Sequence, residues 1–159
     1  MASGTAHDRF TRLLALPFAL LCWPWLGPAG LVAGGLAFLI GGLWLSPDLD
    51  TRSRPLRRWG LLACIWGPYR HLVRHRGWLS HTPLLGMACR LLYLGLWILL
   101  VATLLQPLGS PSPNQLLQGL LRLWQLQPKP MLAALLGLEA SAWLHLIQDG
   151  DPLPPPLHR

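Results

Sequence analysis

No charged residue occurs between Leu13 and Leu45, and this uncharged stretch constrains the fold more than any other feature of the sequence. Residues that break or bend helices interrupt it near its middle: Pro24, Gly27 and Pro28. We therefore expect two apolar helices joined by a tight turn, at about residues 12–26 and 29–45. A helix needs about 20 residues to cross the hydrocarbon layer of a membrane. Each expected helix is shorter, which implies local thinning of the bilayer or shallow insertion.

The shortage of charge extends to the whole chain. Hydrophobic residues make up 52% of the sequence and charged residues 12%, against about 25% charged residues in a typical soluble domain. A soluble protein of 159 residues would need more charge to cover its surface, so we expect membrane lipids to surround much of the chain. The three cysteines have no CxxC spacing, which argues against a disulfide framework or a thiolate zinc site.

Further helices are expected along the rest of the chain, separated by proline-rich segments. They are an interfacial aromatic helix at 59–69, an apolar helix at 82–105 with Thr82 as N-cap, an amphipathic helix at 114–127 and a last apolar helix at 131–148. The fold class is therefore all-α, a small helical membrane bundle of about four apolar helices plus short interfacial helices. We expect a single domain over residues 1–159 with a proline-rich tail from about residue 150.

The distribution of basic residues predicts the orientation in the membrane. With four membrane helices the amino end, the central loop and the tail share one side, which carries most of the 13 Lys and Arg residues. The positive-inside rule makes this side cytoplasmic. The same rule accounts for the net charge of +7, so we expect no nucleic-acid partner. A cleaved signal peptide is the alternative for the amino end, but Pro17 and Pro24 would interrupt its apolar core.

Histidines and aspartates are the residues best suited to carry chemistry, and nearly all of them lie at the ends of expected helices. On the expected topology the following residues share one membrane face: His7, Asp8, Asp48, Asp50, His71, His75, His81, His145 and Asp149. An ionisable residue at membrane depth is a functional candidate, because burying it without a partner is costly. Their convergence from several chain segments predicts a polar site at the cytoplasmic face.

Two short patterns in the first half of the chain are typical of metal ligands. Asp48 and Asp50 lie two residues apart in a proline-stiffened turn, so both carboxylates can face one cation. Alternatively, Asp48 caps a helix or pairs with a nearby arginine. His75 and His81 flank a glycine that permits a sharp bend, and neutral imidazole binds zinc and other transition metals. Alternatively, this pair lies in the interface among arginines that contact lipid phosphates.

The last expected helix adds a third pattern. His145 and Asp149 are four residues apart, so they lie on one helix face and can share a metal ion. A plain hydrogen bond between them is the alternative. Glu139 lies closer to the middle of the same helix, and we expect it to pair with Arg90 rather than to bind metal.

A mixed set of imidazoles and carboxylates without thiolates suits a divalent metal ion. Zinc is the metal we expect first, with manganese or iron as alternatives. The number of candidate ligands is large enough for two ions, and two-metal sites catalyse phosphoester hydrolysis.

The order of these motifs resembles a known family. The motifs are His7-Asp8-Arg9-Phe10-Thr11, Ser46-Pro47-Asp48-Leu49-Asp50, Pro68-Tyr69-Arg70, His75-Arg76-Gly77, Leu79-Ser80-His81 and the late His145-x3-Asp149. They are similar to the uncharacterised "metal-binding protein" group of cyanobacteria and other bacteria, which is related to YdjM-type inner-membrane metal-dependent hydrolases. The resemblance implies metal binding by these ligands: His7, Asp48, Asp50, His75, His81, His145 and Asp149.

Three functions are compatible with these residues. A metal-dependent hydrolase of phosphoester or lipid-like substrates would use the cation to activate water, and Arg70, Arg74 and Arg76 would attract an anionic substrate. A non-catalytic metal site would use the same ligands without an open coordination position. Without a metal, the protein would bind anionic lipid or a partner through its basic surface. No residue is assigned as catalytic, although Asp8 or His71 could act as a general base, and the oligomeric state is left open.

Overall fold

The computed structural model describes residues 2–150, which form helices joined by turns and loops, without a strand among them. The expected all-α fold class is confirmed. The elements in chain order, with η for a 3-10 helix, are α1 (Gly4–Leu43), η1 (Pro47–Asp50), α2 (Arg54–Arg58), η2 (Gly60–Ile65), α3 (Trp66–Leu72), α4 (Leu85–Leu105), η3 (Gln106–Leu108), α5 (Pro113–Leu126) and α6 (Pro128–Asp149). The predicted proline-rich tail falls on residues 151–159, which lie outside the described residues.

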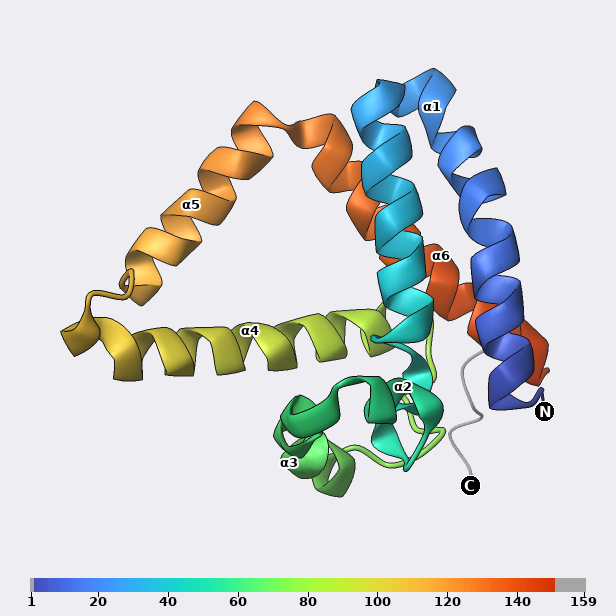
Figure 1. Ribbon diagram of the computed structural model, residues 1–159, viewed down its shortest axis with the longest axis horizontal. Helices are drawn as coiled ribbons and strands as arrows, with labels where there is room; N and C mark the ends of the chain where they lie inside the picture. The colour runs from blue at the N-terminus through green and yellow to red at the C-terminus, as the bar shows by residue number, and fades with distance from the viewer. Residues whose placement is uncertain (1, 151–159) are drawn as a thin grey trace.

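The first long element, α1, is a helical hairpin (Figure 1). Gly27 has a φ of +72°, a left-handed conformation that glycine adopts without the steric cost of a side chain. Pro28 follows as the first residue of the second arm, where the missing N–H of proline costs nothing. The two arms, residues 4–26 and 28–43, run antiparallel beside each other, in agreement with the tight turn that the sequence predicts.

The first arm begins earlier than the sequence indicated. The helix starts at Gly4 rather than at Arg12, because the side chain of Ser3 accepts the N–H of Ala6 as an N-cap. His7 and Asp8 therefore lie inside the first arm, on buried positions, instead of in a segment that precedes it.

Small residues let α6 approach the second arm of α1 closely. A Cβ atom added at Gly137 of α6 would lie 2.4 Å from the carbonyl oxygen of Gly34, and one added at Gly41 would lie 2.1 Å from the Oγ of Ser141. Such contacts are typical of helices that pack through small side chains in membranes. The two arms of α1 and α6 form the packed part of the molecule, which we call the bundle.

The helices α4 and α5 leave the bundle. α4 extends away from it and α5 returns from the far end of α4 to the start of α6, so that the three helices outline an open triangle (Figure 1). The apolar side chains of α4 remain largely uncovered, as at Leu92 and Leu96, which are 70% and 66% exposed. α5 starts with a capping box between Ser112 and Gln115 and has no buried residue.

The start of α4 differs from the prediction. α4 begins at Leu85 with Leu84 as its N-cap residue, so Thr82 lies before the cap, and its hydroxyl donates to the carbonyl of Trp78 in the preceding turn. Leu84 has a φ of +59° and donates its N–H to Glu139 of α6, at 2.7 Å. A side chain from another helix therefore provides the cap, which local sequence does not reveal.

The short helices at 54–72 pack together at one end of the bundle, and we call this part of the molecule the cap. Its core contains Trp66 and Tyr69, which are 0% and 1% exposed, packed against Leu49 of η1 and Tyr93 of α4. The aromatic helix expected at 59–69 is thus split into η2 and α3. This core holds η1, which carries two aspartates, against the end of the bundle.

Within residues 2–150, three helical segments are long and apolar enough to cross a membrane, judged by length and composition alone. They are Gly4–Asp50, Leu85–Leu108 and Pro128–Asp149, and the first of them includes both arms of the hairpin.

Candidate metal centre

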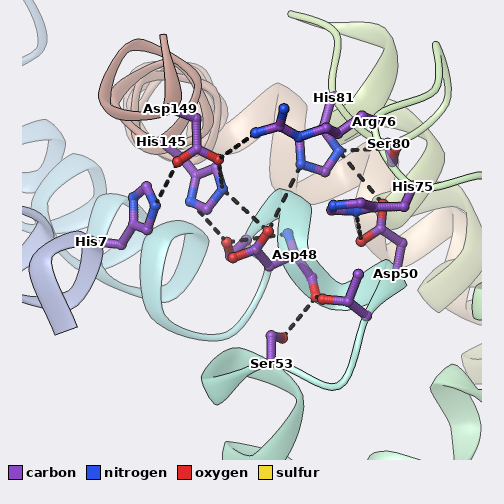
Figure 2. Close-up of polar contacts among 12 residues, drawn as sticks. His7, Asp48, Asp50, Ser53, His75, Arg76, Ser80, His81, His145 and Asp149 are labelled. Atoms are coloured by element: carbon purple, nitrogen blue, oxygen red, sulfur yellow. Dashed lines mark hydrogen bonds and ion pairs between the residues drawn. The ribbon is translucent and has the colours of Figure 1, made fainter. Parts of the chain in front are cut away.

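Histidines and aspartates from four chain segments meet at the end of the bundle next to the cap (Figure 2). The segments are the start of α1, η1, the loop between α3 and α4, and the end of α6. Among the described residues, two groups of potential ligands lie there. The first group contains Asp48, His81, His145 and Asp149, and the second contains Asp50, His75 and His81, so that His81 belongs to both.

In the first group, one ligand atom of each residue lies within 4.8 Å of the others. The Nε2 atom of His145 is 3.5 Å from Oδ1 of Asp48 and 3.6 Å from Oδ2 of Asp149. The Nε2 atom of His81 is 3.8 Å from the same Asp48 oxygen. Ligand atoms bound at about 2.1 Å to one tetrahedral zinc ion lie about 3.4 Å apart, so small shifts would bring these atoms onto a single ion.

Two of these imidazole nitrogens are buried without a hydrogen-bond partner among the described residues: Nε2 of His81 and Nε2 of His145. A buried polar atom without a partner is unusual in folded proteins and calls for an explanation. Both atoms face Asp48, so a cation between them would satisfy both nitrogens and the carboxylate together. The donor set therefore fits a divalent metal ion.

The second ring nitrogen of His145, Nδ1, has a contact that orients the ring. Its Nδ1 atom is 3.3 Å from Oγ of Ser46, which also caps η1 by accepting the N–H of Asp48. The ring stacks on His7 with ring centres 3.9 Å apart. A hydrogen bond to one imidazole nitrogen fixes the tautomer and directs the other nitrogen to a metal. The resemblance had not identified Ser46 as a functional residue.

Asp149 is held from several sides. Its Oδ1 is 3.1 Å from Nε2 of His7 and accepts the N–H of Ala2 at 3.2 Å, while Oδ2 faces His145. The guanidinium of Arg76 is 3.8 Å from Oδ2. The structure therefore brings His7 into contact with Asp149 of the first group, although His7 itself belongs to neither group.

In the second group, Asp50 is paired with His75. The Oδ1 atom of Asp50 is 2.9 Å from Nδ1 of His75, and Oδ2 is 3.5 Å from Nδ1 of His81. The Asp50 side chain is 0% exposed, whereas the His75 side chain is 45% exposed. His81 Nδ1 also lies 3.0 Å from the hydroxyl of Ser80.

The two aspartates of η1 serve different groups, contrary to the expectation that both face one cation. Residues of a 3-10 helix follow one another at about 120° around the axis, so side chains two positions apart diverge. The hydroxyls of Ser53 and Thr51 donate to the Asp48 carbonyl at 2.7 and 3.1 Å and stabilise this turn. Asp48 consequently faces the first group and Asp50 the second.

The loop that carries His75 and His81 is shaped by a tight turn. The N–H of Gly77 donates to the Arg74 carbonyl at 2.9 Å, and a Cβ atom at Gly77 would lie 2.8 Å from that carbonyl oxygen. The hydroxyl of Ser80 donates to the same carbonyl. The glycine between the two histidines thus provides the bend that the sequence predicts, and Ser80 fixes the loop behind His81.

Two buried residues donate hydrogen bonds to the end of this loop. Arg90 of α4, which is 0% exposed, donates to the Ser80 carbonyl at 2.9 Å, and Tyr69 of α3 donates to the Leu79 carbonyl at 3.4 Å. Burial raises the pKa of Tyr69 to about 12, so its hydroxyl remains a donor at neutral pH. Arg90 therefore supports the loop instead of forming the expected ion pair with Glu139, which caps α4.

Other sequence candidates lie outside both groups. Asp8 forms ion pairs with Arg54, at 3.2 Å, and with Arg58, and so ties the first arm of α1 to the cap. His71 is exposed and belongs to neither group. Neither residue is therefore among the candidate metal ligands, and a general-base role for either stays a prediction. His158 lies outside the described residues.

The comparisons with known proteins bear on this site. A 61-residue segment is 44% identical to an uncharacterized protein from Aquifex aeolicus (strain VF5), and it covers 38% of this chain and 43% of that protein. The chain therefore matches less than half the length of that relative. No solved structure matches. Residues 2–154 match the family described as "Uncharacterized metal-binding protein (DUF2227)", and the chain belongs to this family.

Proposed function

From this membership of a metal-binding family, we propose that the protein binds a divalent metal ion through Asp48, His81, His145 and Asp149. The observation that carries the proposal is the pair of buried Nε2 atoms, of His81 and His145, that lie 3.8 and 3.5 Å from the Asp48 carboxylate and have no hydrogen-bond partner within residues 2–150. Two imidazoles and two carboxylates near tetrahedral spacing suit zinc, while manganese and iron accept the same donors.

Metal content tests this proposal directly. Purified full-length protein, stripped with chelator and dialysed against zinc, is expected to retain metal, and the Asp48→Asn and His145→Ala variants are expected to lose the ion of this group. His71→Ala is the matched control, because His71 is an exposed histidine outside both groups. Metal retention in the double variant Asp48→Asn/His145→Ala equal to that of wild type would exclude the assigned ligands.

We also propose that the bundle lies in the bacterial inner membrane with the metal centre at the cytoplasmic face. Three apolar helical segments support this proposal, as do the arginines gathered in the cap and its loops, which the positive-inside rule assigns to the cytoplasm. Exposed leucines on α4 would then contact membrane lipids.

Cys64 offers a test of this orientation. It is exposed in the cap, whereas Cys22 is buried in α1 and Cys89 is partly buried in α4. A membrane-impermeant maleimide is expected to label Cys64 in inside-out vesicles and not in intact spheroplasts, and Cys64→Ser provides the control. Labelling in spheroplasts would reverse the orientation.

The second candidate is a metal-dependent hydrolase of phosphoester or lipid-like substrates. It is favoured by the unequal exposure of the ligands, because the Asp48 side chain is 24% exposed while those of His81 and His145 are 3% and 4% exposed. A substrate would therefore reach the site past Asp48, and Arg76, beside Asp149, would bind its negative charge. The bound ion would supply Lewis acidity and an activated water.

Hydrolysis and simple metal binding differ in the coordination that they need. A catalytic zinc keeps an open position for water, whereas a structural zinc is closed by four protein ligands. Cobalt-substituted protein distinguishes the two: an exchangeable water in its spectra, with turnover of a phosphoester or phospholipid, supports hydrolysis. A saturated site without turnover supports the non-catalytic function. A chain that binds anionic vesicles but no metal would leave only lipid or partner binding.

A further inference from the structure

The imidazole of His81 presents its two nitrogens to different groups of ligands (Figure 2). Nε2 lies 3.8 Å from Oδ1 of Asp48, and Nδ1 lies 3.5 Å from Oδ2 of Asp50. The two nitrogens of an imidazole point away from each other, so one ion cannot bind both. The ring, which is 3% exposed, therefore lies between the two groups. We call the space beside Asp50, His75 and Nδ1 of His81 the second compartment, and the space beside Nε2 of His81 the first.

Asp50 has an unsatisfied oxygen that points into the second compartment. Its side chain is 0% exposed and its Oδ2 has no hydrogen-bond partner among the described residues. Among the described residues, Oδ1 is hydrogen-bonded to Nδ1 of His75, while Oδ2 has only the longer contact of 3.5 Å with Nδ1 of His81. An unsatisfied oxygen on a buried carboxylate is costly, and a cation between Oδ2, His75 and His81 would satisfy it.

We infer that a second divalent cation binds in this compartment, between Asp50, His75 and Nδ1 of His81, with the His81 ring as a bridge to the first ion. This inference rests on the proposed metal site at Asp48, His145 and Asp149 for the first ion. The second ion replaces the proton on Nδ1 of His81 and the contact of that atom with Ser80. Ser80 retains its hydrogen bonds to the loop carbonyls.

The bridging imidazole of His81 determines the distance between the two ions. Two ions bound to opposite nitrogens of one imidazole lie roughly 6 Å apart, given metal–nitrogen bonds of about 2.0–2.1 Å. The two ions of phosphoester hydrolases, by comparison, lie about 3.5–4 Å apart and hold both oxygens of the displacement between them. The second ion is therefore too distant to share the reacting atoms, and it acts by orienting His81 and by withdrawing electrons from its ring.

The two compartments also differ in access. His75 is 45% exposed, whereas the ligands of the first group are mostly buried. With three protein ligands and an open side, the second ion is expected to exchange more readily than the first. Chelation should then remove the two ions in separate steps, the second compartment first.

The number of zinc ions bound per chain tests the inference. Full-length protein in detergent, dialysed against zinc and analysed for elemental content, is expected to hold two equivalents, and the His75→Ala and Asp50→Asn variants one each. His75→Ala is the safer variant because the side chain is exposed, and His71→Ala is the matched control with two equivalents. Far-ultraviolet circular dichroism checks that each variant keeps its helical content.

Copper loading adds a readout that depends on the bridge itself. Two Cu²⁺ ions joined by one imidazole are magnetically coupled, so the doubly loaded wild type is expected to give a weakened electron paramagnetic resonance signal. His75→Ala should restore the full signal of a single uncoupled ion. A full two-ion signal in the wild type would overturn the bridge.

The outcomes separate this inference from the proposed function. One zinc equivalent in wild type, unchanged by His75→Ala but lost in Asp48→Asn, would overturn the second compartment and leave the first site intact. Two equivalents in both wild type and His75→Ala would overturn the assignment of the second ligands. No retained zinc at all would overturn both proposals.

Discussion

The hairpin α1 of the bundle and the helix α4 are both strongly apolar, but they differ in how much of each is buried by the rest of the protein. In the apolar window of the first span, Gly4–Asp50, 56% of residues are buried at a mean hydropathy of 1.8. In the α4 span, Leu85–Leu108, only 11% are buried although the mean hydropathy is higher, at 2.1. The more apolar helix is thus the one that protein covers least (Figure 1).

This difference shows that hydropathy does not decide which helix packs against protein. Lipid tails are as apolar as leucine, so helices associate in membranes through close packing and polar contacts. α1 and α6 have glycines at their contact and candidate metal ligands at their shared end. α4 instead contributes one buried charge, Arg90, at its first turns and turns its leucines outward.

Matched glycine substitutions test this comparison, and the largest effect is expected in the bundle. Gly137→Ala would place a Cβ 2.4 Å from the Gly34 carbonyl oxygen and 2.9 Å from the Phe38 nitrogen. Both are backbone atoms that cannot move alone, so we expect a loss of about 2–3 kcal/mol in the free energy of unfolding. Denaturation in mixed detergent micelles, followed by circular dichroism, measures this loss.

The same substitution should also reduce zinc retention, because α6 carries His145 and Asp149 and would be pushed away from η1. Unchanged stability in Gly137→Ala would show that the two arms of α1 are not in close contact with α6. The bundle would then be no more closely packed than α4.

A smaller loss is expected where the bundle joins the cap. Asp8→Asn removes the charge that pairs with Arg58 and Arg54. Arg54 is 42% exposed, so solvent screens its share, and Arg58 accounts for most of an expected loss of about 2 kcal/mol. Arg122→Gln on the exposed helix α5 should change stability by less than about 0.5 kcal/mol. Equal effects of the two variants would mean that the cap is not tied to the bundle through Asp8.

The next prediction concerns the support that the first arm gives to the metal centre. His7→Ala removes the contact with Asp149 Oδ1 and the ring stacked on His145. Loss of a group that orients a ligand is expected to weaken zinc affinity about 10-fold, which competition with a fluorescent chelator measures. Loss of the zinc ion of the first group at saturating concentration would instead make His7 a ligand, as the resemblance implies. His71→Ala again serves as the unaffected control.

The sequence predicts those features that depend on the order of residues along the chain. The uncharged stretch with Pro24, Gly27 and Pro28 predicts the hairpin, because few conformations other than a turn accommodate such residues. The placement of His and Asp residues at helix ends predicts that they converge. His75, His81, His145 and the two aspartates of η1 lie together for this reason.

Other features depend on contacts between distant segments and could not be predicted. Glu139 caps α4 from another helix, so Thr82 is not the cap that its position before Pro83 suggests. The division of the ligands into two groups follows from the 3-10 geometry of η1, which separates Asp48 from Asp50. The role of Ser46 at His145 was equally hidden, since serine is common and its hydroxyl becomes informative only when its neighbour is known.

The smallest expected effect comes from Gly95→Ala in α4. It tests directly whether α4, unlike the bundle, lacks a closely packed neighbour. A Cβ atom at Gly95 would meet nothing within 4 Å, and alanine is favoured over glycine inside a helix by about 0.5–1 kcal/mol. Gly95→Ala is therefore expected to stabilise the protein by about that amount and to leave zinc affinity unchanged. The same denaturation and competition measurements used for Gly137→Ala apply. A destabilising effect would show that α4 packs closely against a surface outside the single chain, such as a second copy of the chain.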